Sequence, residues 1–173
     1  MSRLPPLCIA IMSILWADSA QAVDVSRYDQ QSAVGLCQAQ LPAHRDSLRA
    51  RPLGLTNDGT TPIFVNCGWQ GDDAAGSTRG ATRISVNVSN GGTTPIVVNC
   101  TLISGFQSGF VTQATYTPKA IGVTAGSGGF IEWVPAEVAG APATIKLPSV
   151  SCQLPPKATL QYTGKVYSEN VGS

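Results

Sequence analysis

An eleven-residue segment that occurs twice constrains the fold of this chain more than any other feature. Residues 57–67 read NDGTTPIFVNC and residues 90–100 read NGGTTPIVVNC, so nine of the eleven positions are identical. In each copy a glycine turn leads into a strand whose first residues include proline, which cannot donate a backbone hydrogen bond and suits a strand start. The repeat is either a duplicated supersecondary unit with related strands in two sheets or the same turn chemistry used twice. Two copies are too few for a solenoid.

The repeat also gives its cysteines a direction. Successive side chains of a strand point to opposite faces, so each cysteine shares a face with the residues two and four positions away. The resulting apolar sets are Ile63, Val65 and Cys67; Ile96, Val98, Cys100 and Leu102; and Val150, Cys152 and Leu154. We therefore expect at least these three thiols to point into the core.

The first 22 residues have the pattern of a secretory signal. Arg3 precedes an apolar run over residues 7–17, and Ala20-Gln21-Ala22 supplies the small residues of a cleavage site. An apolar run of this length is too short to span a bilayer. We expect cleavage after Ala22, followed by a single domain over residues 23–173 that is periplasmic or secreted and does not insert into a membrane.

Cleavage would remove Cys8 and leave four cysteines, Cys37, Cys67, Cys100 and Cys152. An even number of thiols in an exported protein predicts two disulfides. If each sheet contributes to both bridges, the simplest pairing joins Cys37 to Cys67 and Cys100 to Cys152. The alternative joins Cys67 to Cys100 and Cys37 to Cys152. The wide spacing lacks the close ligand pairs of a structural zinc site, so we expect no metal.

Strand patterns dominate the rest of the chain. Residues 83–89 alternate with Ile84, Val86 and Val88 inward, and residues 158–166 with Leu160, Tyr162 and Val166 inward, each strand having one wet face. Further predicted strands are 34–40, 114–117, 121–123, 130–134, 144–147 and 149–154. Residues 42–51 predict a surface loop or one or two helical turns, and 71–80 and 124–129 predict loops. Many short strands and frequent turns favour an all-β antiparallel sandwich, Greek-key or Ig-like, with a barrel as second choice.

Composition and residue types argue against most chemistries. The net charge is +1 with 12% charged residues and no basic cluster, so nucleic acid is not an expected partner. The single imidazole, His44, lies in a polar basic stretch, and oxidised thiols leave no cysteine nucleophile. Glu132 and Glu137 flank Trp133 and could suggest a pair of catalytic carboxylates. We expect Glu132 to lie on a solvent-exposed strand face and Glu137 in a proline-rich turn, so neither is an expected catalytic residue. We therefore expect no enzyme activity and no cofactor.

Four aromatic residues are the candidate binding residues. Trp69, Phe106, Phe110 and Tyr116 surround loop glycines. Rings that stand out of the core in this way could stack on sugars or contact a protein partner. Trp69 is the first of them to test.

The cysteine contexts resemble a group of small exported bacterial proteins of uncharacterised function. The matching motifs are Cys37, Val65-Asn-Cys67, Cys100-Thr-Leu102 and Cys152-Gln-Leu-Pro155, although Gly68 stands where a proline often follows the second cysteine. The resemblance implies a disulfide-bonded sandwich with no known activity. Pilin-like subunits share export and a cross-linked sandwich, but residues 23–32 are too polar for a strand that inserts along a groove.

Three functional hypotheses follow from the sequence. The leading one is an exported, non-enzymatic β-sandwich of the cell envelope or extracellular space with a structural or binding role. The second is a protein that binds, or less readily cleaves, carbohydrate. The third is a self-associating subunit of an extracellular assembly.

Overall fold

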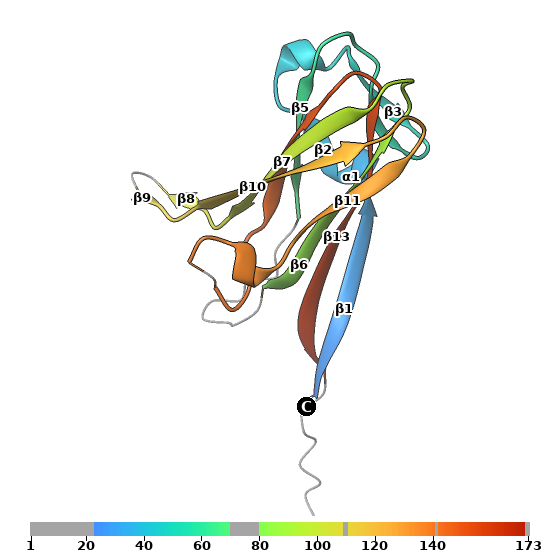
Figure 1. Cartoon of the computed structure of the whole chain (residues 1–173). Helices are drawn as coiled ribbons and strands as arrows, with labels where there is room; N and C mark the ends of the chain where they lie inside the picture. The colour runs from blue at the N-terminus through green and yellow to red at the C-terminus, as the bar shows by residue number, and fades with distance from the viewer. Residues whose placement is uncertain (1–22, 70–79, 109–110, 141, 172–173) are drawn as a thin grey trace, which may run out of the picture.

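Two antiparallel sheets face each other and form a β-sandwich (Figure 1). The computed structural model describes residues 23–69, 80–108, 111–140 and 142–171, so the predicted signal and most of the predicted loop at 71–80 lie outside the described residues. The sandwich prediction is confirmed. The described strands do not close into a barrel, the second choice. No helix in these ranges has the length and hydropathy needed to cross a membrane.

Each sheet has a defined strand order. Sheet A has the order β11-β6-β13-β4-β3, with β1 also paired to β13, and sheet B has the order β10-β7-β12-β5-β2. Sheet A contains β1 (Val23–Ser32), β3 (Leu48–Arg51), β4 (Gly54–Asn57), β6 (Ala81–Asn90), β11 (Gly128–Trp133) and β13 (Ala158–Val171). Sheet B contains β2 (Cys37–Ala39), β5 (Ile63–Gly68), β7 (Ile96–Ser104), β10 (Thr115–Val123) and β12 (Ser149–Leu154). The short hairpin β8 (Gln107–Ser108) and β9 (Val111–Thr112) and the turns α1 (Ala33–Leu36), η1 (Pro42–His44) and η2 (Pro135–Glu137) complete the set.

The core lies between the sheets and follows the predicted alternation. Cys67, Cys100 and Cys152 are at most 2% exposed, so the predicted direction of the three thiols is confirmed. Trp133 is fully buried on β11, and its indole N–H donates to the Thr117 carbonyl at 3.0 Å. The Trp133 ring is therefore buried with its indole donor paired, whereas the buried indole N–H of Trp69 has no partner among the described residues.

The two disulfides join Cys37 to Cys67 and Cys100 to Cys152, as the simplest pairing predicted. The premise that each bridge links the two sheets was wrong, because both bridges lie within sheet B. Cys37 stands opposite Cys67 in the β2–β5 pair, and Cys100 stands opposite Cys152 in the β12–β7 pair. Directly opposed residues come close enough, with Cα separations of 4.1 and 4.0 Å. Facing sheets are roughly 10 Å apart, which is too far for a disulfide.

The repeated segment forms the same structure twice. In each copy the chain leaves sheet A at a buried asparagine, turns, and enters sheet B: β4 leads to β5, and β6 leads to β7. The amide of Asn57 donates to the carbonyls of Thr61 and Leu154, and its oxygen accepts from the Gly59 N–H. The amide of Asn90 makes the corresponding bonds, donating to Thr94 and Val123 and accepting from Gly92. Each asparagine is at most 1% exposed.

The equivalence extends to the segments that pack against each copy. The backbone N–H of Lys157, between β12 and β13, donates to the Asn57 carbonyl at 2.8 Å. The N–H of Gly126, between β10 and β11, donates to the Asn90 carbonyl at 2.9 Å. Both donors have left-handed backbones, with φ of 66° and 68°. These matching bonds favour the interpretation of a duplicated unit, but the two repeat strands, β5 and β7, lie in one sheet and not in two as predicted.

Several predicted elements differ from the structure near the chain's turns. The first part of the predicted strand 34–40 is the single turn α1, because the Ser32 hydroxyl accepts from the Val34 N–H and caps it. The predicted strand 144–147 is reduced to one bridge between Ile145 and Ala81, and Pro148 follows at once. Within the stretch expected to be a loop, Leu48–Arg51 forms β3. Polar β1 was not predicted at all and pairs with β13 along its whole length.

A bulge reverses the predicted faces of β13. The register shifts between Leu160 and Tyr162, which leaves Gln161 as an extra residue. Tyr162 therefore pairs with Asn87 on the outer face instead of pointing inward, and Thr163 is fully buried opposite Val86. A shift of one residue exchanges the two faces of a strand, and the alternation in the sequence does not reveal it.

The outer face of β6 is less exposed to solvent than predicted. Ser85 and Asn87 are both only 7% exposed although they point away from the core. The residue opposite Asn87 on β11 is Phe130, and the one on β13 is Tyr162. Their rings lie 5.9 Å apart and cover this part of the sheet. Val166, also expected inward, pairs with an outward position of β6.

Replacing either buried asparagine by alanine should destabilise the oxidised protein by about 2–3 kcal/mol, because buried donors and acceptors would lose their partners. Urea unfolding of Asn57→Ala and Asn90→Ala measures this loss. Asn99→Ala, at an exposed position of the same repeat, is the matched control and should change stability by less than about 0.5 kcal/mol. Losses at 57 and 90 no larger than that of the control would contradict the role of the two asparagines.

Mild reduction should open the Cys37–Cys67 bridge before the Cys100–Cys152 bridge. Cys37 is only partly buried at the edge of the core, whereas Cys100 and Cys152 are 2% and 0% exposed. Alkylation at timed intervals, followed by peptide mass mapping, should label residues 37 and 67 first. Simultaneous labelling of all four thiols would indicate that reduction requires global unfolding.

Candidate functional site

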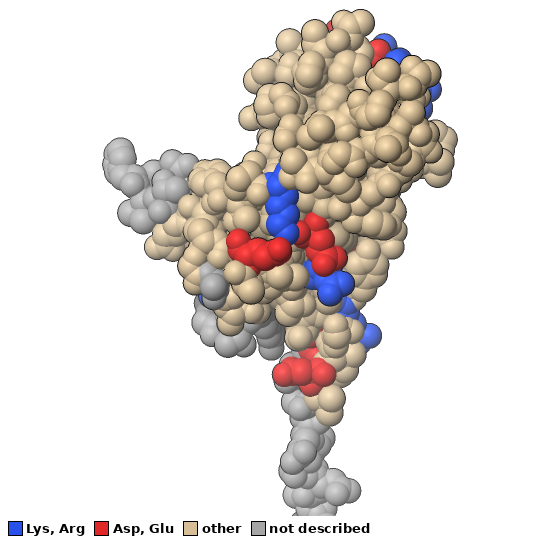
Figure 2. Space-filling view, in the orientation of Figure 1, with Lys and Arg blue, Asp and Glu red and all other residues tan. Residues whose placement is uncertain are grey.

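The outer face of sheet B carries no charged side chain among its described strand residues. Alternation places on this face Gln38, Phe64, Asn66, Gly68, Val97, Asn99, Thr101, Ile103, Tyr116, Pro118, Ala120, Gly122, Ser149, Ser151 and Gln153. Amides and hydroxyls therefore alternate with apolar groups on one continuous surface. In the view of Figure 2, blue and red atoms gather in the middle and lower part of the molecule, and the surface around them is largely tan.

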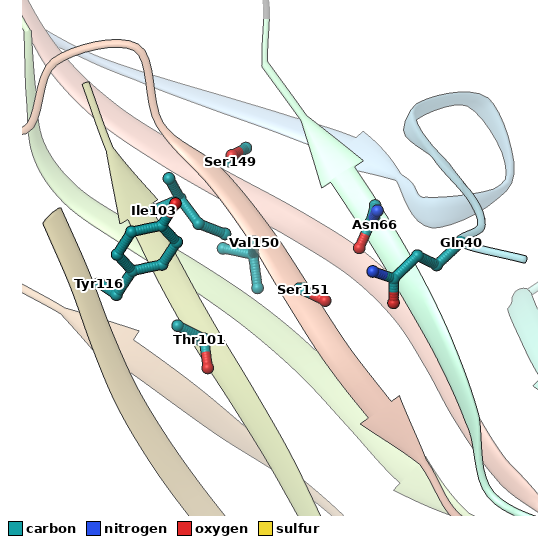
Figure 3. A pocket seen from close by; sticks show the side chains of 8 residues that line it. All are labelled: Gln40, Asn66, Thr101, Ile103, Tyr116, Ser149, Val150 and Ser151. Carbon is teal, nitrogen blue, oxygen red and sulfur yellow. The ribbon is translucent and has the colours of Figure 1, made fainter. Parts of the chain in front are cut away.

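A pocket of about 410 Å³ opens on this face of sheet B (Figure 3). Its lining consists of Gln40, Asn66, Thr101, Ile103, Tyr116, Ser149, Val150 and Ser151. The volume falls within the range of small-ligand sites. Strands β10, β7, β12 and β5 each contribute to the lining, so hydrogen-bonded neighbours fix its floor.

Two positions give the pocket its chemical character. Tyr116 is 60% exposed and stands opposite Ile103, so a flat ring borders the pocket. The side-chain oxygen of Asn66 is buried and has no hydrogen-bond partner. The amide of Gln40 lies beside Asn66 in Figure 3, and its backbone N–H donates to the Phe64 carbonyl at 2.9 Å. The pocket therefore offers one aromatic ring and an amide oxygen that still needs a donor.

The structure separates the four predicted binding residues. Tyr116 lines the pocket, and Phe106 is 48% exposed at the start of the β8–β9 hairpin, outside the lining. Trp69 is only 6% exposed and belongs to the core cluster, so the expectation that it stands out of the core was wrong. Burying the large apolar surface of a ring that directly follows a core strand stabilises the fold more than leaving the ring exposed. Phe110 lies outside the described residues.

The polar floor of the pocket was not predicted from the sequence. The same alternation that predicted the inward direction of Cys67, Cys100 and Cys152 places their sequence neighbours Asn66, Thr101 and Ser151 outward. These residues were not singled out because isolated serines, threonines and asparagines on a strand are usually only solvated. Their proximity becomes visible once the strand order β7-β12-β5 is known.

The two carboxylates that flank Trp133 hold ordinary ion-pair partners. Glu132 lies on the outer face of β11, and its carboxylate is 3.5 Å from Arg83. Glu137 lies in η2, as the proline-rich turn predicted, and accepts from the Lys119 ammonium and the Val134 N–H. These bonds, that from Lys119 first, lower the pKa of Glu137. A carboxyl with a lowered pKa is ionised at neutral pH and is a poor general acid.

No group of three or more described His, Cys, Asp or Glu side chains is arranged to hold a metal ion.

The two disulfides are typical of proteins that fold outside the reducing cytosol.

Lys119→Met should raise the pKa of Glu137 toward the ordinary value for glutamate, because the largest cause of the lowering is the hydrogen bond from Lys119. A lowered pKa in the folded state means that the stabilisation is present above the unfolded pKa and is lost as pH falls through the folded pKa. NMR titration of the side-chain carboxyl measures the shift. Arg83→Met, which removes the partner of Glu132 instead, should leave Glu137 unchanged. An equal titration midpoint in the wild type and in Lys119→Met would contradict the assignment.

Comparison with known proteins found no matching family model and no matching curated protein. Among solved structures, the chain is similar to a family 11 carbohydrate-binding module from Clostridium thermocellum in complex with a β-1,3-1,4-mixed-linked tetrasaccharide, at 9% identity and a TM-score of 0.38, covering 92% of this chain and 90% of that one. It is also similar to a CBM4 structure at 9% identity and a TM-score of 0.35, covering 84% and 85% of the two chains. A third is TmCBM61 in complex with β-1,4-galactotriose, at 8% identity and a TM-score of 0.28, covering 83% and 88%.

Proposed function

We propose that this protein is an exported, non-enzymatic binding protein that holds a neutral carbohydrate on the outer face of sheet B. The observation that carries the proposal is the pocket at Tyr116, in which one exposed ring borders a floor of amides and hydroxyls. The lack of charge and the mixture of side chains at this pocket support a carbohydrate over a charged ligand or a protein surface.

The absence of charge on the described strand residues of this face selects a neutral ligand. An anionic or cationic ligand would lose its hydration without gaining an opposite charge, at a considerable cost in free energy. A neutral ligand gives up only hydrogen bonds to water, and the pocket can replace them. Side-chain amides both donate and accept, as the hydroxyl groups of a sugar also do.

The mixture of side chains fits a sugar better than a protein surface. The centres of protein interfaces are depleted in serine, whereas Ser149 and Ser151 lie in the middle of this pocket. Tyr116 supplies an apolar ring face on which the C–H face of a sugar ring can stack. The hydroxyl group of Tyr116 lies at the solvent-exposed side of the ring. The unpartnered Asn66 oxygen supplies an acceptor for a ligand hydroxyl.

Tyr116→Ala should weaken binding of the recognised oligosaccharide about tenfold, since the loss of one stacked ring costs roughly 1.4 kcal/mol. Affinity electrophoresis and calorimetry on a panel of neutral gluco-, galacto-, manno- and xylo-oligosaccharides measure the effect. Leu53→Ala, which removes a 75% exposed side chain in the β3–β4 turn, is the matched surface control.

Both variants should melt at the wild-type temperature, and the wild type should leave every sugar in the panel uncleaved. If the wild type binds no member of the panel, or if Tyr116→Ala and Leu53→Ala bind equally well, the proposal fails. If the wild type cleaves a sugar and Glu132→Gln does not, the proposal that the protein is not an enzyme is refuted.

A further inference from the structure

A second exposed aromatic surface lies on the opposite side of the sandwich, on the outer face of sheet A. Three rings come from three different strands: Tyr28 from β1, Tyr162 from β13 and Phe130 from β11. Tyr28 and Phe130 are 55% and 57% exposed, which makes them two of the most exposed aromatic rings that the structure describes. The strands that carry these rings lie on one side of the molecule in Figure 1.

The three rings pack over small and polar groups of the sheet. A Cβ at Gly164 would lie 2.8 Å from the Tyr28 hydroxyl oxygen and 2.6 Å from Ser85 Oγ, so the Tyr28 side chain lies against the bare backbone of β13. On the other side of Tyr162, the Phe130 ring meets it at an interplanar angle of 64°. Tyr28 thus covers Gly164 beside Ser85, and the three rings together form an aromatic surface over small groups of β13 and β6.

Asn87 provides an independent sign that this surface receives a ligand. It lies between Phe130 and Tyr162 in the register of the sheet and is 7% exposed. Its amide donates to the Gly129 carbonyl at 3.5 Å, while its side-chain oxygen has no partner. An unpaired buried acceptor costs free energy, and a ligand hydroxyl that reaches it would remove that cost.

The charges at the border of this surface also favour a neutral ligand. Arg83 and Glu132 are 3.5 Å apart and neutralise each other at one end. Burial, and secondly the neighbouring Tyr28, raise the pKa of Tyr162, so its phenol remains a neutral hydroxyl group. From β1 to β11 the surface spans three strand spacings, roughly 14 Å. This length suits a chain of several linked rings better than a single small molecule.

We propose that the outer face of sheet A is a second binding site, at Tyr28, Tyr162, Phe130 and Asn87, for a neutral oligosaccharide that lies across the strands. The assignment does not depend on the sheet B pocket. One consequence does rest on the proposed function: with a site on each outer face, the protein bridges two glycan chains. Its role is then to cross-link polysaccharide and not only to attach to it.

The test compares single-site variants of the full mature chain on the same panel of neutral oligosaccharides. Tyr28→Ala/Phe130→Ala should abolish the sheet A site and lower the binding stoichiometry from two to one, while Tyr116→Ala should leave the sheet A site intact. Phe130→Leu keeps apolar volume without a ring and should weaken sheet A binding about tenfold, whereas Phe130→Trp should retain it. Leu53→Ala and thermal melting control for the fold.

The outcomes separate the two proposals. Binding that Tyr116→Ala removes and Phe130→Leu leaves unchanged would overturn the second site and leave the first. Binding lost only with Phe130→Leu would overturn the sheet B proposal and leave the sheet A site. A wild-type dimer in sedimentation that Tyr28→Ala/Phe130→Ala converts to monomer would show that a second copy occupies this face and would overturn the inference. Clumping of a neutral polysaccharide by the wild type, but by neither site variant, is the result expected for bridging.

Discussion

The register of sheet B is the constraint on which the candidate site depends, and two disulfides hold it. Cys100 stands opposite Cys152 on the core side, which places Thr101 beside Ser151 on the outer side. In the same way, Cys37 opposite Cys67 places Gln38 beside Asn66. A slip of one residue would send these polar groups into the core and the cysteines to the surface. The covalent bonds inside the sandwich therefore fix the pattern of donors and acceptors outside it, and in the chain-entropy model loops of 30 and 52 residues contribute roughly 3.5 and 4 kcal/mol to stability.

The repeated turns connect this sheet to its partner. Asn57 and Asn90 each complete the hydrogen bonds of a turn that carries the chain from sheet A to sheet B, and each also accepts from a residue with a left-handed backbone in a neighbouring connection. Strands β4 and β6 consequently flank β13 in one sheet, and β5 and β7 flank β12 in the other. The pocket lies on this repeated framework, which positions its polar side chains in a small chain with 18 glycines and 12 prolines.

The sequence was informative wherever a strand keeps strict alternation, and misleading where a local irregularity interrupts it. The inward residues of β5, β7 and β12 could be predicted because their apolar positions repeat every two residues. The cysteine pairing was predicted correctly, but from bridges between the sheets, and both bridges lie within sheet B. The bulge at Gln161 turned Tyr162 to the outer face, so one ring of the sheet A surface could not be predicted from alternation. Trp69 was misplaced because it was assigned to a glycine loop, although it continues the alternation of Ile63, Val65 and Cys67 and is buried with them. The site residues Asn66, Thr101 and Ser151 come together only through strand order, which alternation does not encode.

The most direct test of the account is an NMR titration of the oxidised, isotope-labelled protein with the neutral oligosaccharide that it retains. The account predicts progressive shifts in the backbone amides of Thr101 and Ser151 and in the side-chain amides of Gln40 and Asn66. If these signals stay in place at saturating sugar, the outer face of sheet B does not bind carbohydrate.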